Sequence, residues 1–82
     1  MIGELVKVIW LDSQDHKDNW VAQEDAEAFT DEECKIISYG ILVKKTAKYI
    51  TIAGDWDASD KDYGRVTKIP LGMILEVTSL NV

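Results

Sequence analysis

The chain has 82 residues, a hydrophobic fraction of 46% and a formal net charge of −6 at pH 7. This length allows one domain, residues 1–82, with a single small core, so self-association would be a natural further source of stability. The acidic balance disfavours nucleic-acid binding, which depends on lysine and arginine neutralising phosphates, and no apolar run is long enough to span a membrane.

The N-terminal segment MIGELVKVIW lacks the basic region and long apolar region of a secretion signal. Residues 4–12, ELVKVIWLD, overlap this segment, and their β-branched and aromatic residues predict a first strand. The single cysteine, Cys34, rules out an intramolecular disulfide and fits a reducing compartment. We therefore expect a cytoplasmic location in a bacterial host.

A long acidic segment follows the first strand. Residues 11–33 hold nine acids and one lysine, which gives −8 and leaves +2 for the rest of the −6 chain. Within it, residues 19–29 predict a short helical turn that Asn19 caps, with Trp20 docking on the body of the domain.

The remaining elements predict four more strands. Residues 35–45 form the second, and Gly40 inside it indicates a bend or a close backbone contact. Residues 48–56 form the third, 57–64 a hairpin loop, 65–69 the fourth and 74–80 the fifth. The chain's only proline, Pro70, would begin a 3₁₀ turn over residues 70–73, where its missing amide donor costs nothing.

This order of elements resembles the Src-homology-3 type of small barrel, and IPLGMI (69–74) matches the segment at that fold's 3₁₀ turn. The resemblance implies an all-β fold with a minor helical turn, in which a long acidic loop follows strand 1 and the 3₁₀ turn precedes strand 5. Sm-like barrels share this topology but begin with a helix, which the N-terminus here lacks.

Four motifs together resemble a family of small bacteriophage and prophage proteins. The motifs are V-x-W-x-D at 8–12, S-x-G-x-L-V at 38–43, Y-I-x-I-A at 49–53 and I-P-x-x-M-I at 69–74. Tyr39 departs from the pattern, because the family usually has a small or aliphatic residue there. The resemblance implies a viral origin and a small barrel, and it brings no activity with it.

Residues with catalytic or metal-binding chemistry are few. One histidine, His16, and one cysteine cannot supply the four ligands of a Cys/His zinc site. The acidic run 55–62 fails the calcium-loop test, because Asp60 stands where the sixth-position glycine belongs and Val66 where the twelfth-position glutamate belongs. We therefore expect no catalytic residues, no metal, no cofactor and no enzymatic activity.

Aromatic and acidic residues in the loops predict a protein-binding surface instead. An exposed tryptophan among carboxylates is typical of a contact anchor, and acidic clusters steer basic partners. The predicted partner-binding residues are Trp20, Asp55, Trp56, Asp57 and Tyr63. A separate set of basic residues could hold an anionic ligand: Lys44, Lys45, Lys48 and Arg65.

Apolar residues occupy both faces of the strands at 4–12 and 35–45, although a solvated face should be polar at every other position. The acidic segment or another subunit must cover the second face, and we expect a homo-oligomer. The preferred hypothesis is a non-enzymatic protein-binding module. The alternatives are an oligomeric sink for a small anionic nucleotide and an Sm-like RNA binder, which the charge disfavours.

Overall fold

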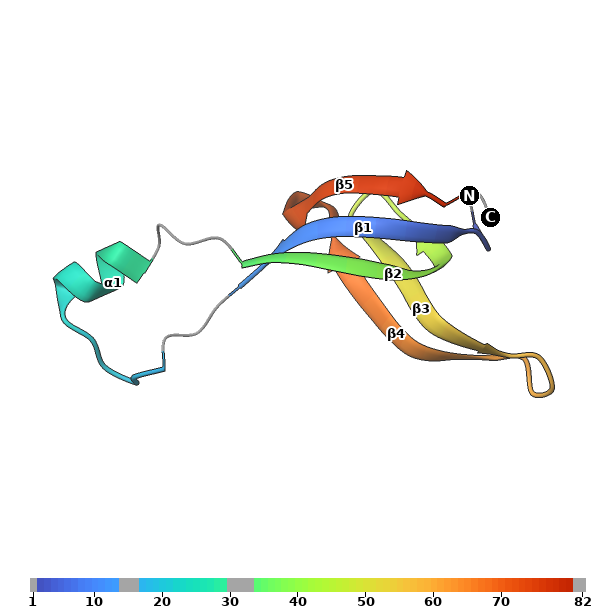
Figure 1. The fold of residues 1–82 in the computed structure, drawn as a ribbon, viewed down its shortest axis with the longest axis horizontal. Helices are drawn as coiled ribbons and strands as arrows, with labels where there is room; N and C mark the ends of the chain where they lie inside the picture. The colour runs from blue at the N-terminus through green and yellow to red at the C-terminus, as the bar shows by residue number, and fades with distance from the viewer. Residues whose placement is uncertain (1, 14–16, 30–33, 81–82) are drawn as a thin grey trace.

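The computed structural model describes residues 2–13, 17–29 and 34–80 and contains one antiparallel sheet with one short helix (Figure 1). The elements in chain order are β1 (Leu5–Asp12), α1 (Gln23–Phe29), β2 (Cys34–Lys45), β3 (Tyr49–Asp57), β4 (Asp62–Pro70), the 3₁₀ turn η1 (Leu71–Met73) and β5 (Ile74–Ser79). The strands lie in the order β4-β3-β2-β1-β5. The predicted five strands and 3₁₀ turn are confirmed, and the sheet is open, with β4 and β5 at its two edges.

One face of the sheet carries the core. Alternate side chains of a strand point to opposite faces of the sheet. Val6 and Val8 of β1 are therefore fully buried, whereas Leu5 points to the other face and is exposed. The buried apolar cluster consists of Val6, Val8, Leu42, Ile50, Ile52 and Ile69. Trp10 packs against this cluster, and its indole Nε1 donates a hydrogen bond of 3.0 Å to Ser38 Oγ.

Gly40 marks the place where β2 changes partner. Residues 34–41 of β2 pair with β1, whereas residues 41–45 pair with β3. A Cβ atom at Gly40 would lie 2.8 Å from the backbone oxygen of Ala53 and 3.2 Å from Ile52 Cβ. Since real Cβ atoms do not come that close to a carbonyl oxygen, the expected close backbone contact is confirmed.

Pro70 ends β4 and leads into η1, as predicted. Its φ of −62° and ψ of 138° are those of an extended residue. Because β4 is an edge strand, the missing backbone N–H of Pro70 leaves no neighbouring strand without a hydrogen-bond donor on the side that faces away from β3. The next amide, of Leu71, donates to the backbone oxygen of Lys48 (2.9 Å), and Ile69 and Ile74 on either side contact the core.

The acidic segment differs from the prediction. The helix begins at Gln23, and its first intrahelical bond runs from Ala26 N to Ala22 O, so Asn19 lies too early to cap it. Trp20 does not dock on the body of the domain, because 94% of its surface is exposed. Residues 17–29, which we call the arm, project from one end of the sheet (Figure 1). The docking prediction was wrong because the local pattern of residues does not determine long-range packing.

The hairpin between β3 and β4 also differs, because its strands are longer than predicted. Both strands continue to Asp57 and Asp62, so the loop shrinks to residues 58–61. The Asp57 carboxylate accepts hydrogen bonds from the amides of Ser59 (2.9 Å) and Asp60 (3.2 Å), and Lys61 adopts a left-handed φ of 59°. An aspartate that hydrogen-bonds the backbone after it is a typical turn former.

The face of the sheet opposite the core, which we call the outer face, is also apolar. One row of directly opposed residues crosses four strands, from Leu5 through the half-buried Ile41 and the fully buried Ala53 to Val66. Ile37 and Tyr39 continue the patch on β2, with exposed fractions of 54% and 62%. The prediction of apolar residues on both faces is therefore confirmed for β1 and β2.

Candidate functional site

The β3–β4 hairpin presents an exposed aromatic pair. Trp56 and Tyr63 are directly opposed across the two strands, with ring centroids 4.9 Å apart and ring planes inclined by 51°. Such a tilted contact is a favourable geometry for aromatic pairs. About half of Trp56 (47%) and of Tyr63 (41%) remains exposed. Together with Gly3 and Ile41, the pair lines a shallow recess of about 210 Å³, which we call the aromatic recess.

Carboxylates flank the aromatic pair along both strands, and strand alternation directs them to the opposite face of the hairpin. Asp55 and Asp57 flank Trp56 along β3, and Asp62 precedes Tyr63 on β4. Asp55 is engaged by Arg65, whose Nε lies 2.7 Å and whose Nη2 lies 3.3 Å from the two carboxylate oxygens. These hydrogen bonds hold the pKa of Asp55 below its ordinary value and raise the pKa of Arg65. Asp55 and Arg65 therefore form a balanced ion pair, and Asp57 and Asp62 are the directly opposed acids next to the aromatic pair.

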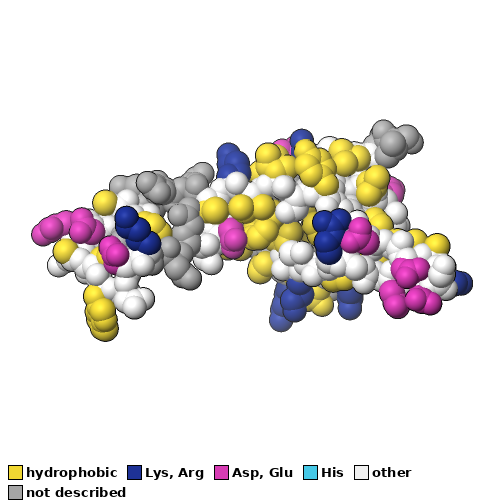
Figure 2. Space-filling view, turned by 60° about the horizontal axis from the view of Figure 1, so that its bottom comes forward, with side chains coloured by type: hydrophobic (Ala, Val, Ile, Leu, Met, Phe, Trp, Pro, Cys, Tyr) yellow, Lys and Arg dark blue, Asp and Glu magenta, His cyan; other side chains and the backbone are white. Residues whose placement is uncertain are grey.

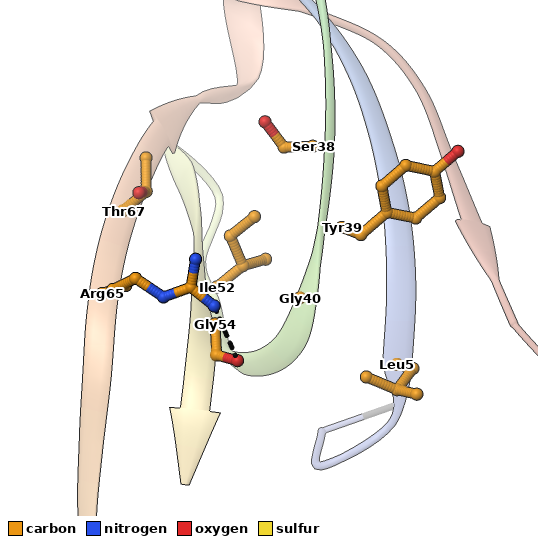
Figure 3. A pocket seen from close by; sticks show the side chains of 8 residues that line it. All are labelled: Leu5, Ser38, Tyr39, Gly40, Ile52, Gly54, Arg65 and Thr67. Carbon is orange, nitrogen blue, oxygen red and sulfur yellow. Dashed lines mark hydrogen bonds between the residues drawn. The ribbon is translucent and has the colours of Figure 1, made fainter.

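A larger pocket of about 470 Å³ opens where β2 and β3 diverge (Figure 3). Its lining residues are Leu5, Ser38, Tyr39, Gly40, Ile52, Gly54, Arg65 and Thr67. The Arg65 side chain lies across Gly54, where a Cβ would stand 2.7 Å from Nη2, and this nitrogen donates to Gly54 O at 3.4 Å. The lining thus includes three hydroxyl-bearing residues, Ser38, Tyr39 and Thr67, and the guanidinium of Arg65, whose charge is already balanced by Asp55.

The predicted basic residues divide between two places. Lys44 is opposite Thr51, and Thr51 is opposite Lys68, so the two lysines lie in one row on the outer face. Lys68 Nζ also lies 4.9 Å from the centroid of the Tyr49 ring. Arg65, by contrast, belongs to the hairpin ion pair. Figure 2 shows that Lys and Arg side chains gather over the sheet, whereas Asp and Glu side chains gather at the hairpin and on the arm.

The structure brings together four of the five predicted partner-binding residues, all on the hairpin: Asp55, Trp56, Asp57 and Tyr63. Trp20 lies apart from them on the arm, at the other end of a molecule 52 Å long (Figure 1). Sequence reasoning missed Lys68, because only the strand register places it beside Lys44. It also missed the pairing of Arg65 with Asp55, which lie ten residues apart in the sequence.

Of the two nucleophile or metal-ligand candidates, the structure describes Cys34 alone. Cys34 begins β2, opposite Asp12, and is half-buried, whereas His16 lies outside the described residues. Among residues 2–13, 17–29 and 34–80, no three His, Cys, Asp or Glu side chains are grouped to hold a metal ion. In the same ranges no helix has the length and apolar character needed to cross a membrane.

Comparison with known proteins adds no relative. No protein-family model matches the chain, and neither a curated protein nor a solved structure matches it.

Proposed function

We propose that this protein acts by binding rather than by catalysis, and that the aromatic recess receives a basic side chain of a partner protein. The observation that supports the proposal most directly is the exposed Trp56–Tyr63 pair, next to which Asp57 and Asp62 are directly opposed across the two strands. Tryptophan and tyrosine are the residues most enriched among energetically dominant interface contacts.

The chemistry of the recess favours an arginine or lysine as the bound group. A cation over an aromatic face gains roughly 0.5–2 kcal/mol, depending on how far it is desolvated. The carboxylates of Asp57 and Asp62 would add attraction and accelerate association with a basic segment. Because Asp55 is already paired with Arg65, it would contribute less than the other two.

The proposed fold and origin agree with such a role. The strand order β4-β3-β2-β1-β5, with η1 before the last strand, supports our proposal that the chain has the Src-homology-3 type of topology, with the sheet left open between its edge strands β4 and β5. Small barrels of this type commonly bind peptides through aromatic residues in their loops. The motif resemblance to phage and prophage proteins supports a phage protein that contacts a host or phage partner in the cytoplasm of the bacterium.

The test is calorimetric titration of the full chain with an arginine- and lysine-rich peptide. We expect binding that weakens as salt is added and that falls at least about tenfold in Trp56→Ala or Tyr63→Ala. Trp20→Ala is the matched control, since it removes an even more exposed tryptophan at the opposite end. Equal peptide affinity in Trp56→Ala and in the unmodified chain would refute the proposal.

A second candidate function rests on the row formed by Lys44, Thr51 and Lys68. Two lysines on either side of a hydroxyl could bind a phosphate, and Lys45 and Lys48 lie at the adjoining turn. We propose a small anionic nucleotide as the alternative ligand. Thermal-shift measurement with a cyclic nucleotide tests it, because ligand binding raises the melting temperature. The increase should disappear in Lys44→Gln/Lys68→Gln and persist in Lys61→Gln.

A further inference from the structure

The arm is a short segment of apolar and acidic residues that leaves Trp20 and Val21 in solvent. Residues 17–28 are all exposed, including Trp20 (94%) and Val21 (37%). Helix α1 has seven residues and buries none of them. Isolated helices shorter than about 12–15 residues are marginal in water. This helix therefore needs a surface to pack against, and Figure 1 shows the arm projecting away from the sheet of its own chain.

The outer face is an apolar surface of the same protein that also lacks a cover. Leu5, Ile37 and Tyr39 lie on its β1 and β2 part with exposed fractions of 44%, 54% and 62%. Val66 of β4 (54%) lies beyond the buried Ala53. Exposed apolar residues scattered singly are ordinary, but a contiguous patch of this kind marks an interaction surface.

Charge distinguishes between the possible occupants of the outer face. Lys7 is opposite Tyr39 and Lys35 is opposite Leu11, so lysines lie among the apolar residues of β1 and β2. A second outer face would bring these lysines against a surface that carries the same lysines and Glu76 of β5, opposite Ile9. The arm instead carries Glu24 and Asp25 in the first turn of α1, both exposed. The arm therefore matches the outer face in both apolar character and charge.

We propose that two copies of this chain form a dimer in which the arm of each lies on the outer face of the other. Such an exchange is self-complementary, so it closes at two copies instead of extending into a filament. It also uses the same contact twice. Each arm–face contact then needs to bury only half of the roughly 1,200–2,000 Å² of total surface that stable interfaces bury. Trp20 alone contributes about 150–250 Å².

The first test is sedimentation velocity of the full chain over a wide range of concentration. We expect a dimer of the 9.2 kDa chain. Trp20→Ala should weaken dimerisation roughly 30-fold or more, as expected for a central interface tryptophan. Because Trp20 is 94% exposed, this variant keeps the monomer fold. Lys61→Gln, in the loop between β3 and β4, is the control and should leave the dimer unchanged. A monomer at every concentration, or a Trp20→Ala dimer of unchanged stability, would overturn the proposal.

The second test reverses the charges on each side of the contact. Lys7→Glu/Lys35→Glu has an acidic outer face and an acidic arm, whereas Glu24→Lys/Asp25→Lys has a basic arm and a basic outer face. Each variant alone should be monomeric. Mixed in equal amounts they should form a heterodimer, because both arm–face contacts then join opposite charges. If the mixture stays monomeric, or if either variant alone still dimerises like the unmodified chain, the arm does not occupy the outer face.

Discussion

Gly40→Ala should destabilise the fold, because β2 and β3 approach each other too closely there for a side chain. The added Cβ would lie 2.8 Å from Ala53 O and 3.2 Å from Ile52 Cβ. The first neighbour is a backbone carbonyl in the sheet and the second a buried side chain, so neither can swing aside. Overpacking of this kind costs about 1–3 kcal/mol. In a chain of this size each kcal/mol lowers the melting temperature by about 4–8 °C.

Thermal and urea unfolding followed by circular dichroism measure this cost. The matched control is Gly72→Ala in η1, where a Cβ would meet nothing within 4 Å and φ lies outside the left-handed region. That variant should be neutral or gain about 0.4–1 kcal/mol, because alanine restricts the unfolded chain. If Gly40→Ala unfolds at the same temperature and urea concentration as Gly72→Ala, the close approach of β2 and β3 does not govern the bend.

Two further predictions concern polar contacts. Trp10→Phe and Ser38→Ala each remove one partner of the 3.0 Å hydrogen bond. A double-mutant cycle of these two changes in urea unfolding should therefore give a coupling free energy of about 0.5–1.5 kcal/mol. A coupling free energy of zero would contradict the contact. Arg65 lowers the pKa of Asp55 in the folded chain below its ordinary value of 3.8. The ion pair therefore stabilises the fold at pH values above 3.8, and this stabilisation is lost as the pH falls through the lowered pKa of the folded chain. Carbon NMR titration should show the lowered pKa, which Arg65→Gln should return toward the ordinary value; an Asp55 pKa that Arg65→Gln leaves unchanged would assign the shift to another cause.

Short-range sequence signals predicted the elements of the fold well. Period-2 alternation locates the strands, and the special backbone chemistry of Gly40 and Pro70 fixes a close contact and a strand end. The two strands of the hairpin were predicted too short, because acidic residues such as those at their ends are typical of loops. In the structure the cross-strand contact of Trp56 with Tyr63 extends the ladder beyond what strand propensity alone indicates.

The register of strand pairing determines which residues meet at each site, and short-range sequence patterns do not specify that register. Arg65 is only three residues from Lys68, yet Arg65 reaches Asp55 while Lys68 shares a row with Lys44. The two basic residues thus serve different surfaces. A shift of pairing by one residue would exchange the faces of every side chain on β4. Predicting the sites therefore required the long-range pairing of β2, β3 and β4.

The positions of the exposed tryptophans connect the two proposals. The outer face and the aromatic recess share Ile41, and an arm that lies on the outer face without passing Ile41 would leave the exposed Trp56–Tyr63 pair of each copy accessible. The dimer would then present two acidic, aromatic recesses on one particle. A partner with two basic segments could engage both, and the second contact would form at the high effective concentration set by the first. Modest affinity at each recess, which a shallow pocket of about 210 Å³ implies, would in this way produce firm binding without any deeper site.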